Sequence, residues 1–157
     1  MFAHQRLSSG LGKSGQLEES LEHCRKAEEY ADRVEKQNPG LVETASRRAD
    51  IRTTRAQAYA WRKQWPEVIA AYNSADLIFD DIRKREPKNQ TYVKDQIEMR
   101  AELADCYAAT GLWPGAIRTI ESALDGLAEV ASLGPLLPEE EKQRLAALAK
   151  LEGWKRK

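Results

Sequence analysis

The segment with the most chemical potential is the glycine-rich stretch Gly10–Gly15, which reads Gly-Leu-Gly-Lys-Ser-Gly. It satisfies the pattern G-x-G-x-x-G and contains the Gly-Lys-Ser tail of a phosphate-binding loop. A phosphate loop would need glycine at Leu7, however, and both motifs require a preceding strand in a βαβ unit. No part of the sequence alternates apolar and polar residues long enough for a strand. We therefore expect Gly15 to be a turn glycine between two helices, and we expect no cofactor.

Cysteine and histidine are too scarce to build a catalytic or metal site. Cys24 and Cys106 fall on helical faces that also carry apolar residues, where a thiol packs as a small hydrophobe. His23 is next to Cys24, and neighbouring helical residues point about 100° apart, so the two cannot share a metal. His4 has no motif around it. We expect no catalytic residue, no metal site and no enzymatic activity in this chain.

Charge and hydropathy exclude two further classes of protein. The 157 residues contain 25 Lys+Arg and 25 Asp+Glu, so the net charge is zero and the electrostatic signature of nucleic-acid binding is missing. No segment approaches the ~20 apolar residues of a membrane span, and the N-terminus lacks the apolar core of a signal peptide. We expect a cytoplasmic protein that binds neither nucleic acid nor membrane.

Three of the four tryptophans divide into two groups. Trp65 and Trp113 each precede a proline and lie 48 positions apart, which favours a repeated packing role. Trp61 has no aromatic counterpart, because Ala109 occupies the equivalent position. We interpret Trp61 as an exposed or groove-facing anchor for a ligand.

An internal repeat organises the chain. Pro39, Pro87 and Pro135 are spaced 48 positions apart, and Ala27, Ala75 and Ala123 recur at the same interval. The prolines delimit repeats of about 1–40, 41–88 and 89–135.

Within each repeat the apolar residues recur every three or four positions, which predicts helices in antiparallel pairs. A last helix of about 139–155 is expected to cap the array, with Leu145, Leu148 and Leu151 turned inward. Seven helices are predicted in all, near 3–13, 17–37, 43–63, 65–85, 91–111, 113–132 and 139–153.

The third repeat resembles the tetratricopeptide repeat (TPR) most closely. It keeps Leu103-Ala104-x2-Tyr107, Gly111, Ala116-x3-Ile120 and Ala123 at the spacing of that family. Arg52 and Arg100 replace the family's tryptophan, and the period is longer than that of the family. Similar long repeats occur C-terminal to bacterial serine/threonine protein kinases, although this chain contains no kinase motif. The resemblance implies an all-α fold, a right-handed α-solenoid forming one domain over 1–157.

The same resemblance implies a non-catalytic protein-protein interaction module within a larger regulatory protein. First helices of such arrays line a groove for a peptide or protein partner. The alternative is a structural spacer or self-association domain of a kinase-type regulator, associating through Phe2, Leu7 and Leu11 at the N-terminal end. The groove residues implied here are Asp50, Thr53, Gln57, Trp61, Glu98, Ala101 and Asp105.

Charge is unevenly distributed between two of the predicted helices. Six bases and two acids lie in 43–63, whereas 91–111 carries four acids and two bases. Two interpretations follow: charge complementarity between packed helices, or a groove with one basic and one acidic wall.

Overall fold

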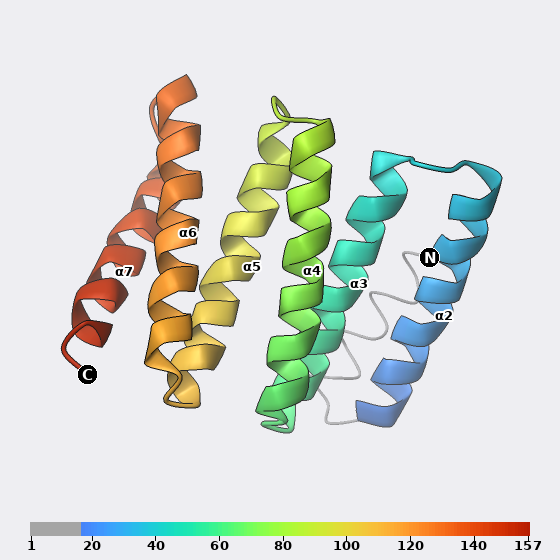
Figure 1. The fold of residues 1–157 in the computed structure, drawn as a ribbon, viewed down its shortest axis with the longest axis horizontal. Coiled ribbons are helices and arrows are strands. Elements are labelled where there is room, and N and C mark those ends of the chain that lie inside the picture. Colours follow the sequence, from blue (N-terminus) through green and yellow to red (C-terminus); the bar gives the residue numbers. More distant parts are fainter. Residues whose placement is uncertain (1–16) are drawn as a thin grey trace. The chain divides into compact units, whose positions relative to one another are not determined.

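The computed structural model describes residues 17–157, and every regular element in that part of the chain is an α-helix (Figure 1). The prediction of an all-α fold is confirmed for these residues. The helix expected near 3–13, the glycine-rich stretch Gly10–Gly15, and the apolar residues Phe2, Leu7 and Leu11 lie outside them. The described helices are α2 (Leu17–Gln37), α3 (Val42–Trp61), α4 (Trp65–Arg85), α5 (Gln90–Ala109), α6 (Trp113–Leu133) and α7 (Pro138–Trp154).

Helix bounds follow the period of the sequence repeat. The helices α2, α4 and α6 begin at Leu17, Trp65 and Trp113, each 48 positions after the last. The other three, α3, α5 and α7, begin at intervals of the same length. Pro66 and Pro114 lie in the first turn of α4 and α6, where the missing backbone N–H costs no helical hydrogen bond.

Two helices end earlier than the sequence pattern predicts. Helices expected to reach Lys63 and Gly111 end at Trp61 and Ala109. Lys63 has φ 55° and Gly111 has φ 74°, and a left-handed residue cannot continue a right-handed helix. The turns thus recur with the same period as the helices, and only one of them uses glycine for the left-handed position.

The chain divides into two compact units, the N-terminal unit Met1–Glu86 and the C-terminal unit Pro87–Lys157. In the described part of the N-terminal unit, α3 packs against both α2 and α4. In the C-terminal unit, α6 packs against both α5 and α7. Successive helices within each unit run antiparallel (Figure 1).

The core of the N-terminal unit combines small residues on α2 with large residues on α4. Cys24 and Ala27 pack against Ile51 of α3, and the Cys24 thiol donates to the Ile51 carbonyl at 3.9 Å. On α4 the side chains of Val68, Tyr72, Ala75, Phe79 and Ile82 are buried. Small α2 side chains bring α2 and α3 close together, while α4 supplies most of the apolar volume.

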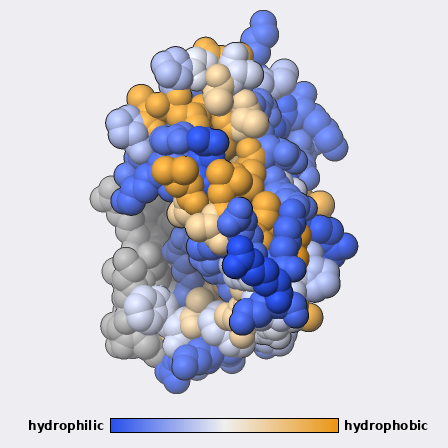
Figure 2. Space-filling view, turned by 90° about the vertical axis from the view of Figure 1, so that its left-hand side faces the viewer, coloured by the Kyte–Doolittle hydropathy of each residue, from blue (hydrophilic) through white to orange (hydrophobic). Residues whose placement is uncertain are grey.

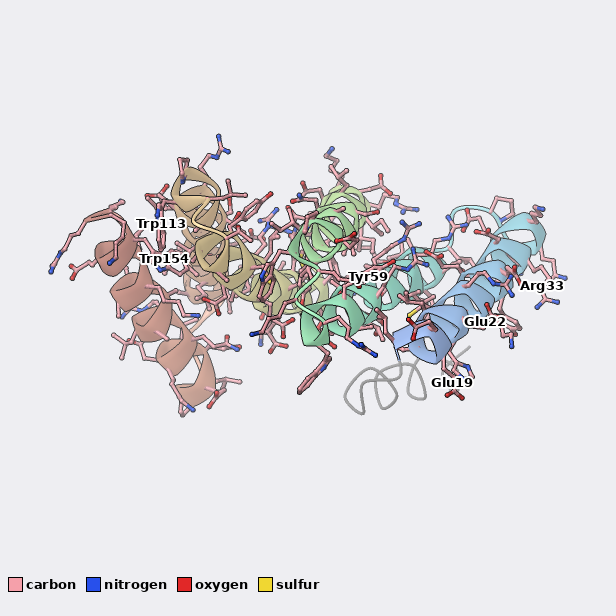
Figure 3. All side chains as sticks on the ribbon, turned by 90° about the horizontal axis from the view of Figure 1, so that it is seen from below. Glu19, Glu22, Arg33, Tyr59, Trp113 and Trp154 are labelled. Atoms are coloured by element: carbon pink, nitrogen blue, oxygen red, sulfur yellow. The ribbon has the colours of Figure 1, made fainter. Side chains whose placement is uncertain are left out.

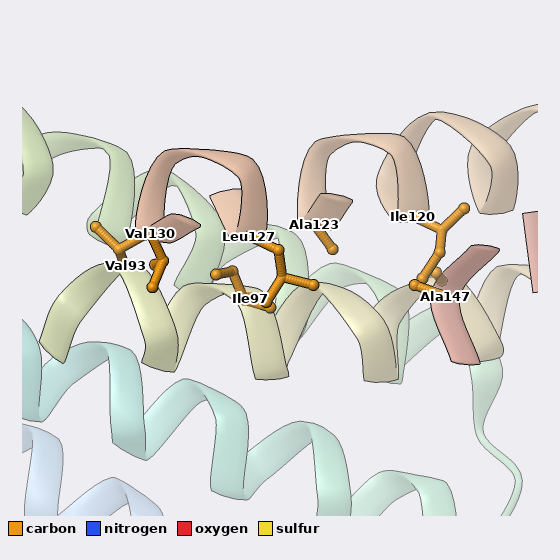
Figure 4. Packing of buried hydrophobic residues seen from close by; sticks show 8 residues of the cluster. Val93, Ile97, Ile120, Ala123, Leu127, Val130 and Ala147 are labelled. Carbon is orange, nitrogen blue, oxygen red and sulfur yellow. The ribbon is translucent and has the colours of Figure 1, made fainter. Parts of the chain in front are cut away.

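The core of the C-terminal unit forms between α5 and α6 and extends to α7 (Figure 4). Val93 and Ile97 of α5 pack with Ala123 and Leu127 of α6, together with Ala147 of α7. Leu151 and Trp154 pack against the edge of this cluster.

The predicted orientation of α7 is wrong for two of its three leucines. Leu151 packs against the core, but the side chains of Leu145 and Leu148 are 56% and 39% exposed. Ala147 takes the buried position, because a residue without a long side chain allows α7 to approach the α5–α6 pair closely. Leucine on a helix is therefore not by itself a sign of the core side.

We expect Gly126→Val to destabilise the protein by about 1–3 kcal/mol through overpacking. A Cβ atom at Gly126 would lie 2.8 Å from Cγ1 of Ile97, in the contact between α6 and α5. The matched control is Gly153→Val on α7, where no atom lies within 4 Å of the added Cβ. Guanidinium unfolding measures both variants, and equal losses would contradict the close helix contact.

Candidate binding surfaces

Four of the predicted site residues lie along one side of α3, which we call the α3 stripe: Asp50, Thr53, Gln57 and Trp61. Their spacing of three, four and four residues places them on one helical face. Trp61, at the C-terminal end of α3, is 57% exposed, whereas Thr53 and Gln57 are half-buried. The Asp50 carboxylate lies 3.5 Å from the Arg47 guanidinium. The stripe thus offers polar groups along the helix and one large aromatic at its end.

The other three predicted residues, Glu98, Ala101 and Asp105 of α5, lie beside α7. Glu98 Oε1 accepts a hydrogen bond from Gln143 at 3.5 Å, and the Asp105 carboxylate pairs with Lys150 at 2.7 Å. Ala101 packs against the core cluster and lines, with Glu98, a cavity of about 260 Å³. The side chains of Glu98 and Asp105 therefore connect α5 to α7.

A third contact between α5 and α7 is the ion pair of Lys94 with Glu140, at 2.7 Å. Glu140 also accepts a hydrogen bond from the Leu137 N–H at 2.8 Å, at the start of α7. Lys94, and then the Leu137 N–H, lower the pKa of Glu140. Because folding lowers this pKa, the ionised Glu140 carboxylate stabilises the folded protein at pH values above its unfolded-state pKa. This stabilisation is lost as the pH falls through the folded-state pKa.

Opposite charges face each other between α2 and α3. Glu28, Asp32 and Glu35 follow one side of α2, and Arg48, Arg52 and Arg55 follow one side of α3 at the same spacing. Glu28 pairs with Arg52, with 2.8 Å between Oε1 and Nε, and also with Arg55, while Asp32 pairs with Arg48. These pairs show that three bases of α3 have acidic partners on α2. The complementarity expected between 43–63 and 91–111 concerns a different pair of helices and stays a prediction.

A groove of about 730 Å³ lies along these ion pairs, with α2, α3 and α4 as its walls. Its charged lining includes Asp32, Arg48 and Arg85, and its apolar lining includes Leu77. Sequence reasoning missed this groove, although the matching spacing of the α2 acids and α3 bases was a visible signal. Both signs of charge line it, so its electrostatics favour neither a purely anionic nor a purely cationic ligand.

The outer face of α2 carries ion pairs between residues one turn apart. Glu19, Glu22 and Arg33 point away from α3 (Figure 3). Arg25 pairs with Glu22 one turn away and lowers the pKa of that carboxyl to about 2. Such pairs between exposed neighbours on a helix are typical of a solvated surface.

Neither cysteine has the environment of a reactive thiol. Burial, and then the nearby Asp105 and Glu102 carboxylates, raise the pKa of Cys106 to about 11, so its thiol stays protonated at neutral pH. Cys24 is buried at 1% exposure. Among residues 17–157, no three His, Cys, Asp or Glu side chains gather as a potential metal site.

Comparisons of the chain with protein-family models, curated proteins and solved structures found no match. None of the helices within residues 17–157 combines the length and the apolarity that a bilayer crossing requires.

Proposed function

We propose that this chain is a non-catalytic protein-protein interaction module, built as a TPR-like right-handed α-solenoid, that binds a peptide or protein partner in the cytoplasm. The observation that supports it best is the exposed indole of Trp61 at the end of the α3 stripe. Tryptophan is highly buried on average and is enriched among the residues that dominate protein interfaces. The helix bounds, which recur with the period of the sequence repeat, support the repeat architecture.

On this proposal Trp61 is the anchor, and Asp50, Thr53 and Gln57 orient the ligand through hydrogen bonds. The other three predicted residues, Glu98, Ala101 and Asp105, have a structural role in this proposal: they hold α7 against α5. Glu98 and Asp105 each contact a residue of α7. We favour peptide ligands that place no free carboxylate against the α3 stripe. The one charged side chain of the stripe, Asp50, is acidic and would repel such a group.

Panning a random peptide library on the immobilised full chain tests this function. We expect enriched peptides to bind Trp61→Ala at least ~30-fold more weakly than the wild type, as for the loss of an interface anchor. Tyr30→Ala is the matched control, because Tyr30 is an aromatic on α2 with 46% exposure. Thermal unfolding checks that both variants stay folded.

Two results would reject the proposal. One is a library that yields no enriched peptide on the wild type. The other is a set of enriched peptides that bind Trp61→Ala and the wild type equally, which would remove the α3 stripe from the binding site.

A further inference from the structure

The outer side of α7 is apolar where a helix at the edge of a unit would ordinarily be polar. Leu145 and Leu148, one turn apart, are 56% and 39% exposed. Leu133 and Leu137, around the turn that leads into α7, are 64% and 59% exposed. Figure 2 shows hydrophobic side chains gathered on this side of the protein. We call Leu133, Leu137, Leu145 and Leu148 the α7 leucine face.

The apolar surface continues from α7 onto α6. A groove of about 870 Å³ runs between the two helices. Leu124, Ala128 and Ala131 line it on the α6 side together with Asp125, and Leu148 lines it on the α7 side together with Glu141 and Arg144. Leu136 lies at its end. Exposed leucines gathered around one helix mark an interaction site, because it costs free energy to leave them in water.

The α7 leucine face does not fit a further helix of the repeat, packed on α7 as α6 packs on α5. Ala104 of α5 is fully buried in its contact with α6, and Ala56 at the equivalent position of α3 is fully buried too. The equivalent position of α7, one period after Ala104, is Glu152, whose side chain is 78% exposed. A helix packed on α7 as α6 packs on α5 would bury the Glu152 carboxylate, at a large desolvation cost.

The charges along α7 point to a different occupant. Its first turn carries Glu139, Glu140 and Glu141, while Lys155, Arg156 and Lys157 follow at its end. A helix with an acidic start and a basic end is electrostatically complementary to an antiparallel copy of itself.

We propose that a second copy of this chain covers the α7 leucine face, with the two α7 helices antiparallel about a twofold axis at Leu148. In this register Leu148 packs against Leu148 of the partner subunit. Glu141 then lies opposite Lys155 of the partner subunit, and Arg144 lies opposite Glu152 of the partner subunit. All four charged residues share the helical face that carries Leu145 and Leu148. The interface is isologous, so each of these contacts occurs twice.

The present partners of these charges do not oppose the association. Glu141 pairs with Arg144 at 2.6 Å, and Lys155 pairs with Glu121 of α6 at 2.9 Å. Both pairs are exposed by 41% or more on each side chain, so each is worth little in the single copy. This inference is independent of the proposed peptide-binding function, because it uses no residue of the α3 stripe.

Analytical ultracentrifugation of the full chain, over roughly 1 to 500 µM, tests the association. The wild type is expected to rise from one 17.8 kDa chain toward twice that mass with concentration. Leu148→Lys places two like charges at the axis and should weaken the dimer by ~100-fold or more. Leu77→Lys on α4, where Leu77 is 72% exposed, is the control and should dimerise as the wild type does.

A charge exchange tests the antiparallel register itself. Arg144→Glu alone places two glutamates together at each contact with Glu152 of the partner subunit, and Glu152→Arg alone places two arginines together, so each variant should be monomeric. An equimolar mixture of the two variants should form a heterodimer, because opposite charges then meet at every contact. A wild type that stays monomeric at all concentrations would overturn the proposal, as would a dimer unaffected by Leu148→Lys. A mixture that stays monomeric would overturn the register.

Discussion

Phe79→Ala is expected to lower the free energy of unfolding by about 3–5 kcal/mol, which is a large share of the stability of an ordinary domain. Phe79 lies on α4 and is only 2% exposed, so truncation removes a fully buried ring. The loss combines the transfer free energy of the ring with the cost of the cavity that remains. Guanidinium unfolding measures the change as a lower midpoint at an unchanged m-value.

The matched control is Leu77→Ala, on the same helix two residues earlier. Leu77 is 72% exposed, so its truncation is expected to change stability by about 0.5 kcal/mol or less. Equal effects at the two positions would mean that α4 packs on a different face from the one the structure shows.

Leu127→Ala is expected to destabilise the protein by about 2–5 kcal/mol. Leu127 is 2% exposed and belongs to the core cluster that joins α5, α6 and α7. It also lines two cavities of about 260 and 230 Å³ beside α7. Truncation enlarges these spaces and removes a packing partner of Ile97 and Ala147, so the cost belongs in the upper part of the range.

Leu145→Ala on α7 is the control for Leu127→Ala. Because Leu145 is 56% exposed, its truncation should leave the stability of the single copy within about 0.5 kcal/mol of the wild type. Thermal unfolding at low protein concentration makes the comparison without a contribution from self-association. A loss at Leu145 as large as that at Leu127 would restore the sequence-based view that Leu145 belongs to the core.

Much of the fold was predictable from local signals. Helix starts coincide with Trp65-Pro66 and Trp113-Pro114, because proline tolerates the first turn of a helix and not its interior. The fully buried Ala27, Ala75 and Ala123 were already distinguished by their recurrence at the repeat period. These features depend on backbone chemistry and on periodicity, both of which can be read along the chain.

The candidate site was predictable only in part. Asp50, Thr53, Gln57 and Trp61 were named from the family resemblance, and they lie on one face of α3 because residues three and four apart share a helical face. The contacts of Glu98 with Gln143 and of Asp105 with Lys150 join residues 45 positions apart, and no local rule specifies such partners. The ligand-binding role of all these residues remains a prediction.

By itself, the sequence determined where the helices begin, which small residues recur at their buried positions, and which helix faces carry acids and bases. Only the tertiary structure decided which of those faces pack against another helix and which stay exposed. Two acids of α2 pair with bases of α3, because antiparallel packing brings Glu28 to Arg52 and Asp32 to Arg48. On α7, apolar residues occur on more than one side, so periodicity could not choose the buried one. A helix can bury only one side against the α5–α6 pair, and on α7 this is the side with Ala147, Leu151 and Trp154. Leu145 and Leu148 therefore stay exposed.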